Sequence, residues 1–180
     1  MVGIGWVVEA IAQLLPLAEP YRVHVVIENH DQDGQGEHPE FAQRFDRFSA
    51  IVDQIDLPRF GVPYDLSHAL VAEQDPLAIL RRFQSRGLTM HASDRHLKDG
   101  FHRNEMMEFR GQGYPEALEH GVVGEGFMAS AEIMGILRDR QFAGWISIED
   151  GVRGFEDLKA SAEFLRRLRD TYFTTPDILR

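Results

Sequence analysis

Four residues whose side chains commonly bind metal ions each follow a short apolar or β-branched run. They are Glu28 after RVHVVI, Asp65 after FGVPY, His91 after LTM and Glu149 after WISI. Three carboxylates and one imidazole form an oxygen-rich ligand set, which suits Mn²⁺, Mg²⁺ or Co²⁺, with Zn²⁺ as an alternative. The chain has no cysteine, so a thiolate site is excluded. These residues predict a divalent-metal site if the fold brings them together.

Each of these residues also has a structural interpretation when it is taken alone. An acidic residue after a strand is commonly a helix N-cap, and Asp65 or Asp94 fits that role. A single histidine at a strand end is more often a surface or hydrogen-bonded residue than a ligand. Four ligand types at four successive strand ends are harder to explain in this way, so we favour the metal site.

Strand-like and helix-like segments alternate along the chain. The expected strands are short and rich in β-branched or apolar residues: 22–28, 60–64, 88–91 and 145–149. The expected helices have apolar residues at helical spacing: 6–18, 39–55, 76–86, 128–140 and 155–172. This alternation predicts an α/β fold with a parallel sheet, in which chemistry gathers at the carboxyl ends of the strands. Residues 92–127 show no clear pattern and are expected to form a long irregular lid or binding loop.

Composition and charge narrow the classes of function. The chain has 180 residues, 43% of them hydrophobic, and a formal net charge of −10. This acidity makes a nucleic-acid partner or binding to an anionic membrane unexpected. No stretch approaches the roughly 20 apolar residues of a membrane span, and the first residues lack the basic start of a secretory signal. We therefore expect a cytoplasmic protein.

Several segments resemble the xylose isomerase-like barrel superfamily, which includes sugar and sugar-phosphate isomerases and epimerases, inosose dehydratases and the endonuclease IV group. The similar segments are VVIENH, GVPYDLSHA, MHASDRHLKDG, VVGEG and FAGWISIEDG, spread between Val23 and Leu168. The resemblance implies a (β/α)8 TIM barrel. A complete barrel typically needs about 250 residues. The similar segments therefore indicate a single domain, 1–180, that contains about four βα units, the C-terminal half of a barrel without strands one to four.

The resemblance also implies roles for individual residues. Glu28, Asp65, His91 and Glu149 would be the metal ligands. Glu28 and Glu149 would also be the catalytic acid/base pair. His68 would bind substrate or support the ligands.

Two further residues are expected near the substrate, and the chain departs from the family pattern at one position. Many epimerase-like members have an arginine six residues after the histidine ligand, where this chain has Leu97. Arg95 and His96 are the nearby substitutes. We favour Arg95, which is expected to contact a hydroxyl, carboxylate or phosphate, with a solvated loop charge as the alternative. His30, in the ENH turn, is expected to orient Glu28 or the substrate, or else to face water.

Half a barrel leaves open strand edges and an uncovered apolar face. We therefore expect a homo-oligomer, in the simplest case a homodimer, or a partner that supplies the missing half-barrel; a truncated chain is the alternative. Sedimentation velocity tests this prediction, because a stable, compact monomer would contradict it.

The leading functional hypothesis is a divalent-metal-dependent isomerase or epimerase of a sugar, sugar phosphate or sugar acid, with proton transfer through an enediolate. An inosose-type dehydratase is the related alternative. An endonuclease IV-like nuclease would need about three zinc ions, for which Asp99 and His102 are candidate extra ligands. An inactive half-barrel remnant is the fourth alternative.

Overall fold

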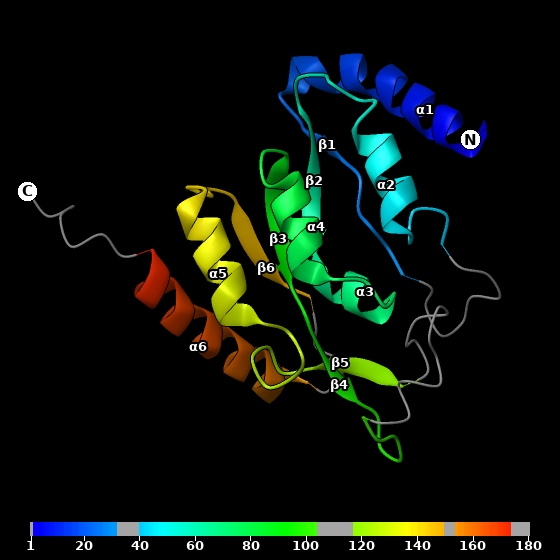
Figure 1. Ribbon diagram of the computed structural model, residues 1–180. Helices are drawn as coiled ribbons and strands as arrows, with labels where there is room; N and C mark the ends of the chain where they lie inside the picture. Colours follow the sequence, from blue (N-terminus) through cyan, green and yellow to red (C-terminus); the bar gives the residue numbers. More distant parts are fainter. Residues whose placement is uncertain (1, 32–39, 104–116, 150–153, 174–180) are drawn as a thin grey trace, which may run out of the picture.

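The main sheet consists of parallel strands. The computed structural model describes residues 2–31, 40–103, 117–149 and 154–173. Its larger sheet has four strands in the order β1-β2-β3-β6 (Figure 1). The strands are β1 (Val25–Val26), β2 (Phe60–Asp65), β3 (Gly87–Ala92) and β6 (Trp145–Ile148). All three pairings are parallel. The predicted α/β fold and the four predicted strands are confirmed, although β1 is shorter than residues 22–28.

Helices connect the strands, as parallel neighbours require. They are α1 (Val2–Ala18), the 3-10 turn η1 (Glu19–Tyr21), α2 (Phe45–Val52), α3 (Leu66–Val71), α4 (Pro76–Phe83), α5 (Ser130–Asp139) and α6 (Phe155–Tyr172). Five of them correspond to the predicted helices, and α2 is much shorter than residues 39–55. The short helix α3 was not predicted, because six residues are too few to show helical periodicity.

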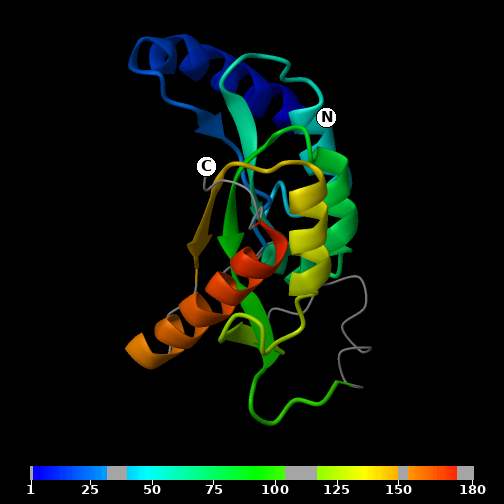
Figure 2. The ribbon, with the colours of Figure 1, turned by 90° about the vertical axis from the view of Figure 1, so that its left-hand side faces the viewer.

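The core occupies one face of the sheet. Val62, Tyr64 and Met90 belong to one buried cluster with apolar residues of the helices, and the partly buried Ile146 packs against it. Figure 2 shows α4 and α5 on that side of the sheet. Because side chains alternate along a strand, the intervening positions point to the opposite face. Asp65 and His91 are among these positions, so the sheet separates its packing face from a polar face.

The described part of the segment 92–127 is not the irregular loop that was expected, and residues 104–116 lie outside the described residues. Its described part contains β4 (Asp94–Leu97) and β5 (Leu118–Gly121), which form a two-stranded antiparallel sheet. The pairing places Arg95 opposite His120. The strands are four residues each, too short for a clear alternation, and they are stabilised by partners distant in sequence. This small sheet lies beyond the carboxyl end of β3 (Figure 1).

Both edges of the larger sheet are uncovered within the described residues. Val26 on β1 is 42% exposed and Trp145 on β6 is 85% exposed. The outer side of α1 also exposes Trp6 and Leu17. Val26 and Trp145 lie on the two edge strands, so association remains a prediction that the open edges and the exposed apolar groups support.

Helix α1 departs from the expectation about membrane spans. The continuous helical segment Val2–Tyr21 has 20 residues and is long and apolar enough, by length and composition only, to cross a membrane. Glu9 and Gln13 interrupt the apolar run, but the segment is still apolar enough to meet the criterion for a membrane span. Helices of soluble cores and signal sequences pass the same criterion, so this finding assigns no location to the protein.

Candidate metal centre

The four predicted ligands converge at the carboxyl ends of the strands. Glu28, Asp65, His91 and Glu149 each offer one ligand atom, and all four atoms lie within 4.8 Å of one another. His91 Nδ1 lies 3.2 Å from Glu28 Oε1 and 4.0 Å from Asp65 Oδ2, and it contacts Glu149 Oε2 directly. The convergence expected from the sequence is therefore present, from residues more than 100 positions apart.

Backbone pairing places each ligand beside the next. Asp65 is in register with His91 across the β2–β3 pair. The ladder continues past the strand ends on both flanks, because Ile27 N donates to Gly61 O at 3.2 Å and Glu149 N donates to Ala92 O at 3.1 Å. The two glutamates therefore come from the two edges of the sheet and approach the centre from opposite sides.

Asn29 fixes the chain directly after Glu28. Its buried side chain donates from Nδ2 to the carbonyl oxygen of Asp65 at 3.2 Å. This bond ties the end of the short strand β1 to the end of β2 and so holds Glu28 near Asp65. Sequence reasoning considered only His30 in the ENH turn and missed Asn29, because the partner is a backbone carbonyl 36 residues away.

Asp65 uses its two carboxylate oxygens differently. Oδ1 accepts from the backbone N–H groups of Ser67 at 2.8 Å and His68 at 3.2 Å, which caps α3. Oδ2 faces the other ligands and has no hydrogen-bond partner among the described residues. The N-cap interpretation and the ligand interpretation of Asp65 are thus both compatible with the geometry.

Four polar atoms at the centre are enclosed and have no hydrogen-bond partner among the described residues. Glu28 Oε1, Asp65 Oδ2, His91 Nδ1 and His68 Nε2 are fully enclosed and lack a hydrogen bond in the described part of the chain. Leaving such atoms unsatisfied costs about 1–3 kcal/mol each. A divalent cation would satisfy the carboxylate oxygens and the imidazole nitrogen together, so this donor set fits a metal ion.

Protonation of Glu28 gives the site a predicted pH dependence. Burial raises the pKa of Glu28 above 4.5, the charges of His68 and His91 lower it, and those of Asp65 and Glu149 raise it further. A proton competes with a metal for the same carboxylate, so metal affinity should fall as the pH decreases through this raised pKa. Calorimetric titration with Mn²⁺ between about pH 8 and about pH 5 measures the effect. An affinity that stays constant over this range would contradict it.

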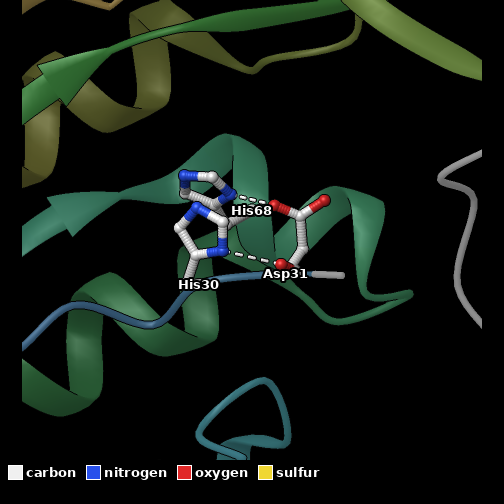
Figure 3. A group of neighbouring side chains, drawn as sticks. All are labelled: His30, Asp31 and His68. Carbon is white, nitrogen blue, oxygen red and sulfur yellow. Dashed lines mark hydrogen bonds and ion pairs between the residues drawn. The ribbon is translucent and has the colours of Figure 1, made fainter. Parts of the chain in front are cut away.

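His68 is oriented by a residue that sequence analysis did not select. Its Nδ1 donates to the carboxylate of Asp31, and both residues are buried (Figure 3). Its Nε2 consequently faces the ligands, 3.3 Å from Asp65 Oδ2 and 3.9 Å from Glu28 Oε1. Burial lowers the pKa of His68, but the hydrogen bond with Asp31 and the charges of Asp65 and Asp31 outweigh it and raise the pKa overall.

His30 lies beside His68 rather than beside Glu28. The two ring centroids are 4.4 Å apart, and His30 Nδ1 donates to the backbone carbonyl of Asp31 at 2.7 Å (Figure 3). His30 is exposed, whereas Asp31 and His68 are buried. Its predicted contact with substrate stays a prediction, and the geometry gives it no direct role in holding Glu28.

Arg95 is part of the buried surroundings of the site, so its interpretation as a solvated loop charge is wrong. It is 7% exposed and lies on β4. Its Nε donates to Ser67 Oγ at 3.1 Å. Burial lowers the pKa of Arg95, whereas the charges of Asp31, Asp65 and Glu149 raise it. Sequence reasoning selected Arg95 as a substitute for the arginine that many epimerase-like members have at the position of Leu97, but the strand β4 that directs Arg95 was not predicted.

Asp94, in contrast, organises the adjacent loop. It is fully buried, and its two oxygens accept backbone hydrogen bonds from Gly124, Gly126 and Met128 at 2.9–3.2 Å. A Cβ at Gly126 would lie 2.4 Å from the Asp94 carboxylate, so only glycine fits there. The VVGEG segment is therefore folded around Asp94, which is not a helix N-cap.

The two candidate extra ligands of a trinuclear nuclease site, Asp99 and His102, do not join the candidate centre. Asp99 and His102 are both exposed. Neither belongs to the two groups of potential metal ligands found in the described ranges, which are the four predicted ligands and the trio of His30, Asp31 and His68.

Solved structures share this fold over most of the chain. A xylose isomerase domain protein from Planctomyces limnophilus has a TM-score of 0.71 and 18% identity, covering 92% of this chain and 53% of that chain. A D-tagatose 3-epimerase-like protein has a TM-score of 0.68 and 22% identity, covering 92% and 54%. Mannonate dehydratase from Streptococcus suis serotype2 has a TM-score of 0.71 and 17% identity, covering 94% and 50%.

These similarities establish the fold, and this chain spans about half the length of each of those proteins. A comparison with curated protein sequences found no match. A family model described as xylose isomerase-like TIM barrel matches residues 2–169, which is nearly the whole chain. Together with the parallel sheet and the half-length coverage, this match identifies the chain as a partial barrel. The chain belongs to the xylose isomerase-like TIM barrel family.

Proposed function

We propose that this chain is the metal-binding half of a divalent-metal-dependent isomerase or epimerase acting on a sugar, a sugar phosphate or a sugar acid. The observation that supports this most directly is the convergence of enclosed, unpartnered ligand atoms of Glu28, Asp65 and His91, with the Glu149 carboxylate beside them. Mn²⁺, Mg²⁺ or Co²⁺ suits these donors, and Zn²⁺ is the alternative.

The two glutamates are the proposed acid/base pair. A divalent cation bound here would polarise the carbonyl oxygen of a substrate and so acidify the neighbouring C–H. Glu28 and Glu149 approach from opposite edges of the sheet, so one can take the proton from carbon while the other returns it from the other side. The raised pKa of Glu28 brings its carboxylate closer to the range in which a group both accepts and donates protons near neutral pH.

His68 is the proposed donor to a substrate oxygen. Asp31 holds its Nδ1, so its Nε2 points toward the space shared by Glu28 and Asp65. A raised pKa keeps this imidazole protonated more of the time, which allows Nε2 to donate a hydrogen bond to oxygen as charge develops there.

A dehydratase is the second candidate, because the same residues could take a proton from carbon and return it to a leaving hydroxide. Two of the similar solved structures are described as dehydratases, a mannonate dehydratase and a probable 3-DHS dehydratase. The exposed positions of Asp99 and His102 make the nuclease less favoured. An inactive half-barrel is the remaining alternative, and activity measurements would distinguish it from an enzyme.

Metal content and hydrogen exchange together test the proposal. We expect about one Mn²⁺ per chain at the four-ligand site. In D₂O, we expect deuterium to enter substrate carbon in a panel of ketoses, ketose phosphates and sugar acids. Loss of water would indicate the dehydratase. Metal binding without exchange would indicate the inactive half-barrel, and absence of metal binding would overturn the proposed function.

A further inference from the structure

A second polar cluster adjoins the metal centre, and none of its members is a proposed ligand. We call it the Arg95 cluster: Arg95, Ser67, Ser93 and His120. Ser67 Oγ accepts from Arg95 Nε at 3.1 Å and lies 3.1 Å from Ser93 Oγ, which is 3.0 Å from His120 Nδ1. Ser67 follows the ligand Asp65, and Ser93 follows His91 by two residues. The cluster is therefore built on the same two strand ends as the site.

Arg95 carries a charge that forms no ion pair with the described residues around it. The side chain is 7% exposed, yet no carboxylate oxygen of a described residue lies within 4.0 Å of it. Among the side-chain nitrogens of Arg95, only Nε donates to an acceptor in the described ranges. Nη1 and Nη2 have no acceptor there, and they are not among the fully enclosed atoms. A guanidinium so placed has its two-pronged donor edge available to a ligand.

Two of the three carboxylates that stabilise the charge of Arg95 are proposed metal ligands. Asp31, Asp65 and Glu149 act on it over longer distances. Asp65 and Glu149 are proposed metal ligands, and Asp31 is engaged with His68. A divalent cation bound by Asp65 and Glu149 would offset part of this negative charge, and a buried charge with reduced compensation is costly.

We propose that the Arg95 cluster binds a carboxylate of the substrate, so that the substrate is a sugar acid. This proposal rests on the proposed function, which it makes more specific. The Nη groups of Arg95 supply a planar pair of donors that matches a carboxylate, and His120 lies opposite Arg95 across the β4–β5 pair.

A carboxylate fits this cluster better than a phosphate does. The cluster has one cation, two hydroxyl groups and an imidazole whose pKa is lowered by burial and by Arg95, so His120 is expected to be neutral. Asp31, Asp65 and Glu149 act electrostatically on Arg95. A divalent cation would offset only part of their charge, and the remainder would repel a dianion about twice as strongly as a monoanion. A single negative charge is what Arg95 balances.

Matched sugars test the proposal on the full chain loaded with Mn²⁺. D-Fructuronate has a carboxylate where D-fructose has a hydroxymethyl group. D-Fructose 6-phosphate has a phosphate dianion at the same end of the molecule. By calorimetry we expect the acid to bind at least about 10-fold more tightly than the other two. Replacing Arg95 with glutamine should remove this preference without weakening the binding of Mn²⁺, because the substitution removes a positive charge that acts on Asp65 and Glu149. One lost charge-assisted contact corresponds to about this factor.

The controls separate the possible causes. Arg81→Gln changes an exposed arginine on α4 and should leave the preference intact. If Arg95→Gln does not fold, as judged by circular dichroism, the substitutions Ser67→Ala and His120→Gln test the same cluster from its other side. Equal binding of the acid and D-fructose, no binding of either, or preference for the phosphate overturns the carboxylate proposal alone. Failure of the unmodified chain to bind Mn²⁺ overturns the proposed function, and this proposal with it.

Discussion

Replacing Asp65 with asparagine is expected to weaken Mn²⁺ binding by about 100-fold or more, which corresponds to about 2.7 kcal/mol. The substitution removes the charge and the ligand oxygen Oδ2, which is enclosed and unpartnered. The amide oxygen of asparagine can still accept from Ser67 N and His68 N as Oδ1 does, because asparagine is as good an N-cap as aspartate. Calorimetry measures the metal affinity, and thermal unfolding of the metal-free chain measures how much the cap contributes to stability.

Asp75 provides the matched control. It caps α4 through Leu77 N at 2.9 Å but lies outside the candidate centre. Asp75→Asn should leave Mn²⁺ affinity unchanged, with a similarly small effect on stability. Equal metal affinity in Asp65→Asn and the unmodified chain would show that Asp65 is only a helix cap.

Substituting glutamine for Glu28 or for Glu149 is expected to reduce deuterium exchange into substrate carbon by at least about 100-fold. Each change leaves the side chain the same size but removes the carboxylate that accepts or returns a proton, and general acid–base catalysis contributes about 10²–10⁴ to rate. Exchange must be measured at saturating Mn²⁺, because both residues are also proposed ligands. The fold should be retained, since both side chains lie at the polar strand ends rather than in the core.

An exposed glutamate on a helix serves as the control for these two variants. Glu132→Gln on α5 should keep full exchange. Normal exchange in either Glu28→Gln or Glu149→Gln would refute the acid/base assignment of that residue, even if metal binding were weakened. Loss of exchange in only one of the two would indicate that a single residue moves the proton in both directions.

The proposed ligand residues were predictable because their information is local. Runs such as VVIE and WISIE indicate strands from a few neighbouring residues, and parallel strands present their carboxyl ends at one edge. Glu28, Asp65, His91 and Glu149 could therefore be chosen without coordinates. The alternation of side chains along each strand also agrees with this choice, because residues of the packing face alternate with the residues that face the site.

The groups that orient those ligands depend on tertiary contacts. Asn29 acts through a backbone carbonyl of β2, Asp31 through His68, and Asp94 through backbone N–H groups about 30 residues later. Nothing in the neighbouring sequence distinguishes Asp94, which holds a loop, from Asp65, which faces the candidate centre. The β4–β5 pair and helix α3 are too short for periodicity to reveal them.

The amino-acid sequence by itself therefore determined the type of sheet, the strand ends and the kinds of ligand they offer. The tertiary structure alone decided which donor atoms face one another, that Arg95 is buried with His120 across from it, and that Asp31 fixes the orientation of His68. The physical reason is range: strand patterns follow from adjacent side chains, whereas burial, hydrogen-bond partners and pKa shifts arise from residues tens of positions away.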